Sequence, residues 1–497
     1  MDLELLLDMA VSLDEHRAAV TGPDGRTLTT GELRTAAAGA ASLLRRGTPE
    51  RVAFCDTNGL GFPVALFGAV LARLPFVPLN YRLADTQLRQ VVAPGELVVA
   101  AAGQIERLTG LGAGRVLDAG AFVDDALAAG PFDGAAPVDP DDVALLLYTS
   151  GTTAAPKAAV LRHRHLAAYV IGTVEFGSAG PGEAALSSVP PYHIAGVMNL
   201  LSNLYMGRRV VYLDAFDPER WLQVVDEQSI THAMVVPTML ARIVSVLGDS
   251  PAEVPSLRTI SYGGAKMPDA VIAKALELFP AVAFANAYGL TETSSTIAVL
   301  GPEDHRLALD SDDPVVRARL ASVGTPLPGI EIEVRDEEGR RCGPGVTGDI
   351  FVRGEQVAGE YLGAGGTSDG WFATRDRGHI DDGGYVFVEG RADDTIIRGG
   401  ENIAPAEIEG VLLAHEDVAD CAVVGIEDVE WGQRIAAAVV LVPGASTGPD
   451  DIRAFARGQL RGSKTPDVVV VFDELPYTDT GKLLRRVVRE ELSRSAV

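Results

Sequence analysis

Cysteine and basic residues are both scarce in this chain of 497 residues. Cys55, Cys342 and Cys421 are odd in number, far apart and in no CxxC pair, which argues against a disulfide framework or a zinc site. The 42 Lys+Arg face 68 Asp+Glu, so the formal net charge is −26. Because such an acidic surface repels nucleic acid and anionic lipid, we expect neither as a partner. Any bound phosphate must then be held by a local site.

Long uninterrupted apolar runs are also missing. The most apolar stretch, 62–79, is broken by Arg73, Pro75 and Pro78. The first five residues, MDLEL, carry acidic side chains, whereas a signal peptide begins with basic ones. We therefore expect a cytoplasmic protein without membrane insertion. At about 150 residues per domain, the length allows roughly two to four domains and favours a large enzyme. The oligomeric state cannot be derived from the sequence.

Apolar periodicity in the first 325 residues alternates between helix and strand. The range 28–46 is a predicted helix, with Thr29 or Thr30 as its N-cap. Short apolar runs predict strands at 51–55, 97–101, 143–148, 209–213, 232–236 and 259–262, with helical stretches between several of them. This alternation predicts an α/β fold whose mainly parallel sheets are covered on both faces.

The sequence becomes rich in predicted strands after about residue 325. These strands lie at 330–335, 348–353 and 384–388. Near residue 390 the pattern changes to a helix at 405–413, strands at 419–425 and 435–442, a helix at 449–460 and a strand at 468–472. We therefore predict an N-terminal domain of residues 1–390 and a C-terminal α+β domain of residues 391–497.

A polar segment, 149–157, directly follows one of the predicted strands. It consists of Thr149, Ser150, Gly151, Thr152, Thr153, Ala154, Ala155, Pro156 and Lys157. Hydroxyls and backbone N–H groups can surround phosphate oxygens while the ammonium group neutralises them. The segment predicts a phosphate-binding loop, although it is not the GxxxxGK[ST] loop of common nucleotide hydrolases.

Lysine usage points to the same segment. The 42 basic residues include only five lysines, and 42 − 5 = 37 are arginines. Where arginine is used nearly everywhere, a lysine in a polar loop with glycine indicates a need for a compact, mobile charge. Lys157 and Lys482 both lie in such loops.

Further motifs, in order along nearly the whole chain, give it a specific resemblance to the adenylate-forming superfamily of acyl-CoA synthetases, peptide-synthetase adenylation domains and luciferases. Besides 149–157 they are 191–196 (PYHIAG), 262–265 (YGGA), 286–293 (NAYGLTET), 374–376 (TRD), 390–394 (GRADD), 399–403 (GGENI) and the pair Gly481-Lys482. The resemblance implies a large N-terminal domain of two α/β subdomains plus a β-barrel part. A small mobile α+β C-terminal domain would follow.

The resemblance also implies ATP-dependent conversion of a carboxylate to acyl-AMP, with release of pyrophosphate. Lys482 would bridge the carboxylate and the α-phosphate, and Glu292 with Thr152 or Thr291 would hold Mg²⁺ and the phosphates. The implied ATP-binding residues are Thr149, Ser150, Gly151, Thr152, Thr153 and Lys157 at the pyrophosphate, Gly263, Gly264, Ala287 and Tyr288 at the adenine, Asp376 and Arg391 at the ribose, and Gly289.

For the second step, the resemblance implies transfer of the acyl group to CoA as co-substrate. Gly399 and Gly400 would leave room for the pantetheine arm, with Glu401 and Trp431 also at the CoA site. Asp393 matches a hinge about which the C-terminal domain would rotate between the two half-reactions.

The implied acyl pocket has small or apolar walls. They are Ala195, Gly196, Val197, Ala285 and Ile297, with His193 as a catalytic gate near the carboxylate. Amino-acid-activating relatives have an acid in the region of His193, and this chain has none there. We therefore expect a bulky hydrophobic or aromatic monocarboxylic acid as substrate.

Several residues depart from the family pattern. Ala154, Ala158 and Arg375 stand where many relatives have glycine, and Asp467 is expected to repel the 3′-phosphate of CoA. Three alternatives therefore stay open beside a CoA synthetase: an acyl-AMP ligase that loads a carrier-protein phosphopantetheine, a nucleotide-binding relative without catalysis, and a luciferase-like oxygenase.

Overall fold

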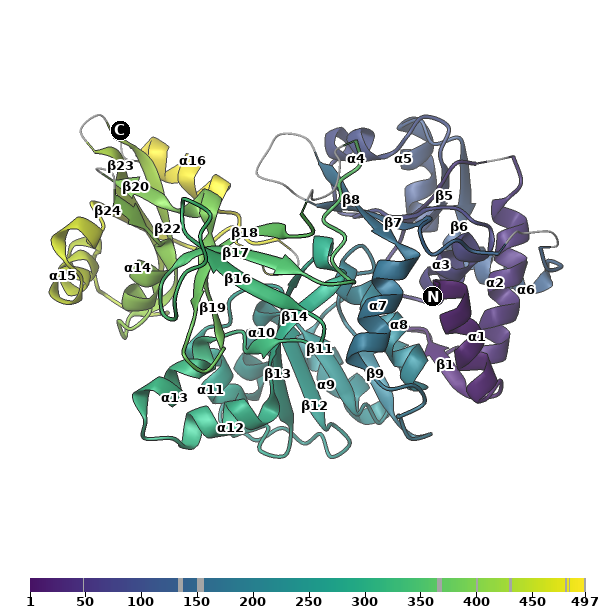
Figure 1. Cartoon of the computed structure of the whole chain (residues 1–497), viewed down its shortest axis with the longest axis horizontal. Helices are drawn as coiled ribbons and strands as arrows, with labels where there is room; N and C mark the ends of the chain where they lie inside the picture. Colours follow the sequence, from purple (N-terminus) through teal and green to yellow (C-terminus); the bar gives the residue numbers. More distant parts are fainter. Residues whose placement is uncertain are drawn as a thin grey trace. The chain divides into compact units, whose positions relative to one another are not determined.

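The computed structural model describes residues 1–47, 49–132, 137–149, 156–363, 369–398, 401–428, 431–478, 481 and 483–495. The chain divides into two compact units (Figure 1). The first comprises Met1–Glu331 and Arg353–Phe372, and the second comprises Ile332–Val352 and Ala373–Val497.

The first unit contains a six-stranded sheet in the order β6-β5-β3-β4-β7-β8. Its strands are β3 (Val52–Cys55), β4 (Phe76–Pro78), β5 (Leu97–Ala100), β6 (Arg115–Asp118), β7 (Val143–Thr149) and β8 (Lys157–Arg162). β7 and β8 are antiparallel, whereas the other neighbours are parallel. Val52 and Phe54 pack into the core on one face, and Ala53 and Cys55 into the core on the other. Because both faces are buried, the strands are continuous apolar runs.

A nine-stranded sheet of the first unit has the order β15-β14-β13-β12-β11-β9-β10-β1-β2. Its strands are β1 (Ala18–Thr21), β2 (Thr27–Thr29), β9 (Ala184–Ser187), β10 (Arg209–Tyr212), β11 (His232–Val235), β12 (Thr259–Gly263), β13 (Ala283–Leu290), β14 (Ser295–Leu300) and β15 (Thr325–Pro326). The neighbours from β13 to β1 are parallel, and β2, β14 and β15 add antiparallel edges.

Helices cover these sheets. They are α1 (Leu3–Leu13), α2 (Thr30–Leu44), α3 (Gly61–Leu71), α4 (Asp85–Val91), α5 (Ile105–Gly110), α6 (Ala119–Ala128), α7 (His163–Thr173), α8 (Ile194–Met206), α9 (Pro218–Glu227), α10 (Pro237–Leu247), α11 (Asp269–Leu278), α12 (Pro302–Asp310) and α13 (Pro314–Ala318). The predicted helix at 28–46 is α2. It begins at a capping box in which the Thr29 hydroxyl accepts from Glu32 N and the Glu32 carboxylate accepts from Thr29 N.

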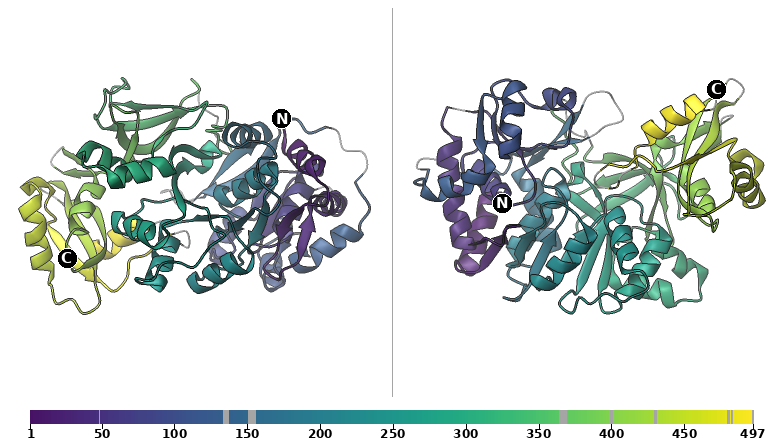
Figure 2. Two further views of the ribbon diagram at one scale, coloured as in Figure 1. Left: turned by 90° about the horizontal axis from the view of Figure 1, so that it is seen from below. Right: turned by 180° about the vertical axis from the view of Figure 1, so that it is seen from behind.

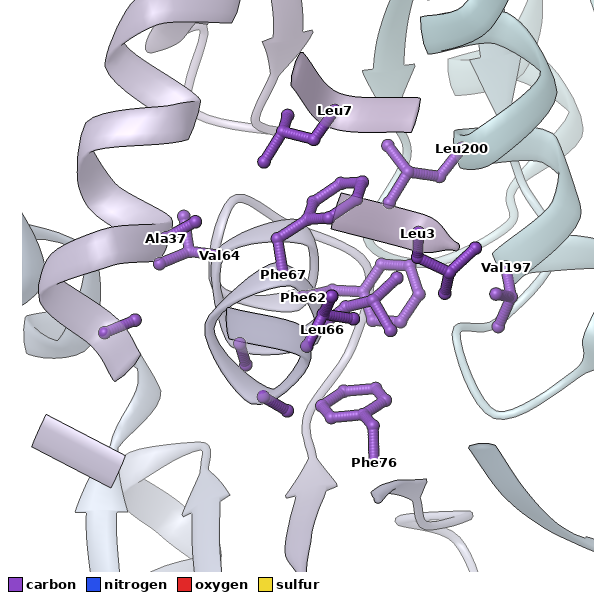
Figure 3. Close-up of a cluster of buried hydrophobic side chains, with 14 of the residues drawn as sticks. Leu3, Leu7, Ala37, Phe62, Val64, Leu66, Phe67, Phe76, Val197 and Leu200 are labelled. Carbon is purple, nitrogen blue, oxygen red and sulfur yellow. The ribbon is translucent and has the colours of Figure 1, made fainter. Parts of the chain in front are cut away.

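The largest core of the first unit gathers α1, α3 and α8 with strands of both sheets. Figure 3 shows Leu3 and Leu7 of α1, Phe67 of α3 and Leu200 of α8 in this cluster, all of them at most 1% exposed. Ten residues of α3 are buried inside the protein. The most apolar stretch of the sequence is therefore explained by packing in the core, and no lipid environment is needed to explain it. No helix within the described ranges has the length and apolarity that crossing a membrane requires.

The second unit is built on two smaller sheets, seen from further sides in Figure 2. One has the order β16-β17-β18-β19, with β16 (Glu331–Arg335), β17 (Gly348–Arg353), β18 (Phe372–Ile380) and β19 (Val386–Arg391). The other contains β20 (Ile396–Arg398), β21 (Glu401–Ile403), β22 (Val418–Asp428), β23 (Gly432–Leu441) and β24 (Val468–Phe472). The helices are α14 (Pro405–Leu412), α15 (Pro449–Gln459) and α16 (Arg485–Ser495).

The predicted α/β fold, with a large N-terminal part and a smaller α+β C-terminal part, is confirmed. Each predicted strand coincides with an observed strand to within a few residues at either end. Residue 390 lies in β19, inside the second compact unit, so the start of a separate mobile domain at residue 391 stays a prediction.

Burial of His165 at the start of α7 makes the stability of the first unit depend on pH. The Nδ1 atom of His165 accepts a hydrogen bond from Arg162 N at 3.3 Å, which caps the helix. Burial, helped by the charges of Arg164 and Arg162, lowers the pKa of His165 to about 4. Because the folded state then binds fewer protons than the unfolded state, stability is present above about pH 6.5 and falls as the pH drops toward 4.

We predict that His165→Gln makes the Tm fall less between about pH 7 and pH 5 than it does in the unmodified protein. Glutamine at this position can still accept the Arg162 N–H but does not titrate. Thermal unfolding at both pH values measures the difference, with His16→Gln as control, because the His16 side chain is 87% exposed. An equal fall in the His165→Gln and unmodified proteins would contradict the prediction.

Candidate active site

The predicted phosphate-binding segment connects the antiparallel strands β7 and β8. Thr149 ends β7 and pairs in register with Lys157, which begins β8. The Thr149 hydroxyl donates to the Lys157 carbonyl at 3.3 Å, and Lys157 is exposed. Ser150, Gly151, Thr152, Thr153 and Ala154 lie outside the described residues, so their part in phosphate binding stays a prediction.

A segment that the sequence analysis did not single out, 356–362, runs beside β8. Val160 N donates to Glu360 O at 2.9 Å, and Leu362 N donates to Ala158 O at 2.9 Å. The Arg162 guanidinium also donates to both carboxylate oxygens of Glu360, each at 2.9 Å. This segment therefore fixes β8, the strand that leaves the predicted phosphate-binding loop.

The same segment holds Glu292, which lies in a short 3₁₀ turn (Thr291–Thr293) between β13 and β14. The N–H groups of Ala358 and Gly359 donate to Glu292 O at 2.9 and 3.2 Å. The Tyr361 hydroxyl donates to the Oε1 atom of Glu292 in a short hydrogen bond. Because Glu292 is only 7% exposed, its carboxylate has a defined position beside β8.

Two serines after this turn have backbone angles that are unusual for side-chain-bearing residues. The φ angles of Ser294 and Ser295 are 53° and 99°. The left-handed region costs an L-residue about 1–2 kcal/mol. Gln356 offsets the cost, because its amide donates to Thr293 O at 3.0 Å and Thr296 O at 2.7 Å. Gln356 O also accepts from the Ser294 hydroxyl at 2.8 Å.

The glycines predicted beside adenine occupy a crowded strand end. Gly263 closes β12 and pairs with Ala287 of β13. A Cβ atom on Gly263 would lie 2.1 Å from Ala287 O, so only glycine fits. Gly264 follows with a φ of 86°, and Tyr288 and Gly289 lie at a β-bulge where β13 faces β14. The structure thus brings Gly263, Gly264, Ala287 and Tyr288 together at one end of parallel strands, where ligands commonly bind in α/β sheets.

The residues predicted to gate and to line the acyl pocket lie around the start of α8 and on β13 and β14. His193 precedes α8, and its ring lies 4.6 Å from that of Tyr192, centroid to centroid. Ala195 and Ala285 are half-buried, Ile297 is fully buried in β14, and α8 contacts β14. The side chain of Val197 is fully buried in the core of Figure 3, and its place in the pocket wall stays a prediction.

In the second unit, Asp376 and Arg391 form a prearranged pair. They face each other in β18 and β19, with Arg391 Nε 3.0 Å from the Asp376 carboxylate. Arg391 Nη1 also donates to Thr374 O at 2.9 Å, and Asp376 N donates to the Thr374 hydroxyl at 3.1 Å. Asp376 is 5% exposed. A carboxylate held in this way can accept two hydroxyl donors of a ribose.

The turn that carries Lys482 is anchored on both sides, although Lys482 itself lies outside the described residues. Before it, the Tyr477 hydroxyl donates to Asp420 at 2.9 Å. After it, Arg485 donates to the Glu409 carboxylate at 2.9 Å and lies 3.5 Å from the Asp394 carboxylate. Asp394 and the predicted hinge residue Asp393 share one short turn, Ala392–Asp394.

The predicted CoA-binding residues are only partly described. Gly399 and Gly400 lie outside the described residues, and Glu401 forms an ion pair with Arg461. The Trp431 side chain is 45% exposed, and the Arg398 guanidinium lies 5.5 Å from its ring centroid.

The structure weakens one expectation about CoA. Asp467 accepts hydrogen bonds from the Arg398 guanidinium and from Ile435 N, the latter at 2.9 Å. Because Arg398 neutralises this carboxylate, Asp467 repels the 3′-phosphate of CoA less than the sequence alone predicts.

Sequence reasoning missed residues whose role depends on contacts between distant segments. Tyr361, Gln356 and Glu360 stand in a glycine-rich stretch, 354–370, which predicts turns but no contact with Glu292. Arg485 was missed because one arginine among 37 carries no information by itself.

Comparisons with known proteins identify the family of the chain. The family model for the AMP-binding enzyme matches residues 7–362, and that for the AMP-binding enzyme C-terminal domain matches residues 407–482. A feruloyl-CoA synthase from Amycolatopsis sp is 34% identical, with 96% of each chain covered. The fatty acid–[acyl-carrier-protein] ligase ScoC of Streptomyces coeruleorubidus is 32% identical over 94% of this chain and 92% of its own.

A solved structure shows the same fold throughout. ATP-bound MatB from Rhodopseudomonas palustris superposes with a TM-score of 0.89 and 27% identity, and 100% of each chain is covered. The predicted acyl-CoA synthetase class is confirmed by these findings. The chain therefore belongs to the AMP-binding enzyme family, the adenylate-forming superfamily that its motifs predict.

Proposed function

We propose that the protein converts a bulky hydrophobic or aromatic monocarboxylic acid and ATP to acyl-AMP and pyrophosphate, and then transfers the acyl group to CoA. The observation that carries the proposal is the fixed Glu292 carboxylate beside β8, the strand that leaves the predicted phosphate-binding loop. Similarity to a feruloyl-CoA synthase over 96% of both chains supports an aromatic acid as substrate and CoA as acceptor.

Adenylation requires that charge be neutralised around the α-phosphate while the carboxylate attacks it. The carboxylate oxygen forms the new bond to phosphorus, and the bond to pyrophosphate breaks. Lys482 would stabilise the developing charge on the α-phosphate, and Lys157 with the hydroxyls of 149–153 would hold the departing pyrophosphate.

Glu292 fits a Mg²⁺ site. Its Oε1 atom is held by Tyr361, whereas Oε2 makes no hydrogen bond to any residue that the structure describes. Carboxylate and hydroxyl oxygens are the ligands that Mg²⁺ prefers, and Thr291 or Thr152 could add a hydroxyl. The ion, when bound, would neutralise phosphate charge.

The acid would lie beside β13, β14 and the start of α8, with His193 near its carboxylate. Ala195, Gly196, Ala285 and Ile297 offer no charge to pair with a second ionised group on the substrate. Desolvating such a group without a partner costs several kcal/mol. Burying an apolar ring gains about 25 cal/mol per Å². A hydrophobic monocarboxylate is therefore favoured over a short dicarboxylate.

The second half-reaction would follow a rotation about Asp393, which replaces Lys482 at the active site with Gly399, Gly400 and Glu401. The thiol of CoA would attack the acyl carbonyl, AMP would leave, and Trp431 would contact the CoA arm. The similarity to ScoC keeps a carrier-protein phosphopantetheine as the second candidate acceptor.

A screen of carboxylic acids for pyrophosphate release, with and without CoA, tests the proposed function. We expect ferulate-like aromatic acids to be activated in preference to acetate and malonate, and thioester to form only with CoA present. Preference for acetate or malonate over every large hydrophobic acid would refute the substrate class, and transfer to a carrier protein but not CoA would refute the acceptor.

We expect Ala285→Leu to raise KM for large acids more than for small ones. Ala285 is half-buried and alternates along β13 with Phe284, whose side chain lies in the opposite core, so a larger residue would extend toward the proposed pocket. Gly196 is less suitable, because an added Cβ atom would lie 2.8 Å from Pro190 O and strain α8. Equal KM changes for all acids would argue against Ala285 as pocket wall.

We predict that Tyr361→Phe lowers the rate of ATP–pyrophosphate exchange by about tenfold, because Glu292 loses the hydrogen bond that orients its carboxylate. Thioester formation from supplied acyl-AMP should be unchanged. Tyr212→Phe is the matched control, since the buried Tyr212 hydroxyl has no hydrogen-bond partner among the described residues. Unchanged exchange in Tyr361→Phe would show that Tyr361 does not position Glu292.

Lys482→Ala should remove most ATP–pyrophosphate exchange and leave thioester formation from supplied acyl-AMP largely intact. Gly400→Leu should do the reverse, because it obstructs the pantetheine path. Lys274→Ala serves as a control for loss of a lysine, since Lys274 of α11 pairs only with the surface carboxylates of Asp249 and Glu277 among the described residues. Equal loss of both half-reactions in Lys482→Ala would contradict domain alternation.

A further inference from the structure

Arg375 has a backbone conformation that favours glycine. Its φ angle is 62°, in the left-handed region. The neighbouring residues hold this conformation, because the Thr374 hydroxyl donates to Ile350 O at 2.9 Å and accepts from Asp376 N at 3.1 Å. The fold therefore demands a strained angle at residue 375, and the chain nevertheless has an arginine there.

Arg73 provides an internal comparison. It also has a positive φ angle, 57°, but its guanidinium donates to Val70 O at 2.9 Å and pairs with Glu4 at 2.8 Å. The Arg73 side chain thus stabilises the fold that strains its backbone. Arg375 is exposed and forms no hydrogen bond or ion pair with any residue in the described part of the chain. Contacts among the described residues give no reason for an arginine at this position.

The charge next to Arg375 is already balanced. The adjacent carboxylate, Asp376, pairs with Arg391 at 3.0 Å. The guanidinium of Arg375 is consequently an uncompensated positive charge beside the proposed ribose site, on a chain whose net charge is −26. A guanidinium matches the oxygens of a phosphate group with two parallel hydrogen bonds.

We propose that Arg375 is a binding residue for a phosphate group of a bound nucleotide. This inference rests on the proposed function, because it takes Asp376 as the ribose site. ATP is the expected source of the phosphate, since Arg375 and Asp376 are adjacent in the chain. The 3′-phosphate of CoA has the same chemistry and is distinguished by the experiment.

The test compares Arg375→Gly, Arg375→Gln and Arg375→Lys in ATP–pyrophosphate exchange with the best acid of the screen. We expect KM for ATP to rise about tenfold in the Gly and Gln variants, since a charge-assisted hydrogen-bonded contact is lost, and to rise less in the Lys variant. Arg375→Gly should not lower the Tm, because glycine relieves the strained angle. Arg341→Gln, in which the lost side chain is 71% exposed, controls for the change in net charge.

Unchanged KM for ATP in Arg375→Gly and Arg375→Gln would overturn ATP as the source of the phosphate. If KM for CoA then rose while KM for dephospho-CoA did not, Arg375 would bind the 3′-phosphate instead. If neither changed, or if Arg341→Gln had the same effect as Arg375→Gln, the proposal would be wrong. Absence of exchange in the unmodified protein with every acid would instead refute the proposed function.

Discussion

Two main-chain hydrogen bonds, from Ala358 and Gly359 to the carbonyl oxygen of Glu292, fix the turn that carries the predicted metal ligand. The segment that donates them is itself bonded to β8, so one stretch of backbone fixes both the predicted metal ligand and the strand after the predicted phosphate-binding loop. Main-chain bonds of this kind do not depend on side-chain rotamers. The sharp turn after Glu292 strains Ser294 and Ser295, and Gln356 satisfies the carbonyl groups that the turn leaves inside. The position of one carboxylate thus depends on residues about 65 positions further along the chain.

Electrostatics explain why so acidic a chain needs a local phosphate site. Lys274 and Lys464 pair with Asp249 and Glu407, whereas Lys157 forms no ion pair with any residue that the structure describes. A lysine that pairs within the fold has little charge to offer a ligand, and an unpaired one attracts phosphate. Cysteine chemistry plays no comparable part, because burial raises the pKa of Cys55 to about 12 and keeps it a neutral thiol. The positive charge that a phosphate ligand can use therefore lies in a few loops, such as the one that ends at Lys157.

The fold was predictable because its buried strands have a simple sequence pattern. Val52 to Cys55 alternate between two cores, and such strands are short apolar runs between polar turns. Within the site, Gly263 was recognisable from its motif, and the structure adds the reason, a contact of 2.1 Å that a Cβ atom would make. Tyr361 was not predictable, since its role arises from a hydrogen bond to a residue 69 positions away. The backbone angle of Arg375 was equally hidden, although the departure from glycine at that position was visible.

Coupling between the predicted hinge and the predicted catalytic lysine follows from contacts inside the second unit. Arg485, three residues after Lys482, binds Glu409 of α14 and lies beside Asp394, the neighbour of the predicted hinge residue. On the other side of the turn, Tyr477 binds Asp420, whose carboxyl pKa is raised by burial. Since these contacts hold Tyr477 and Arg485 on either side of Lys482, a rotation at Asp393 would move both of them together with α14. The predicted alternation between two half-reactions needs this property, because a lysine that moved independently of the hinge would not leave the active site when the thiol enters.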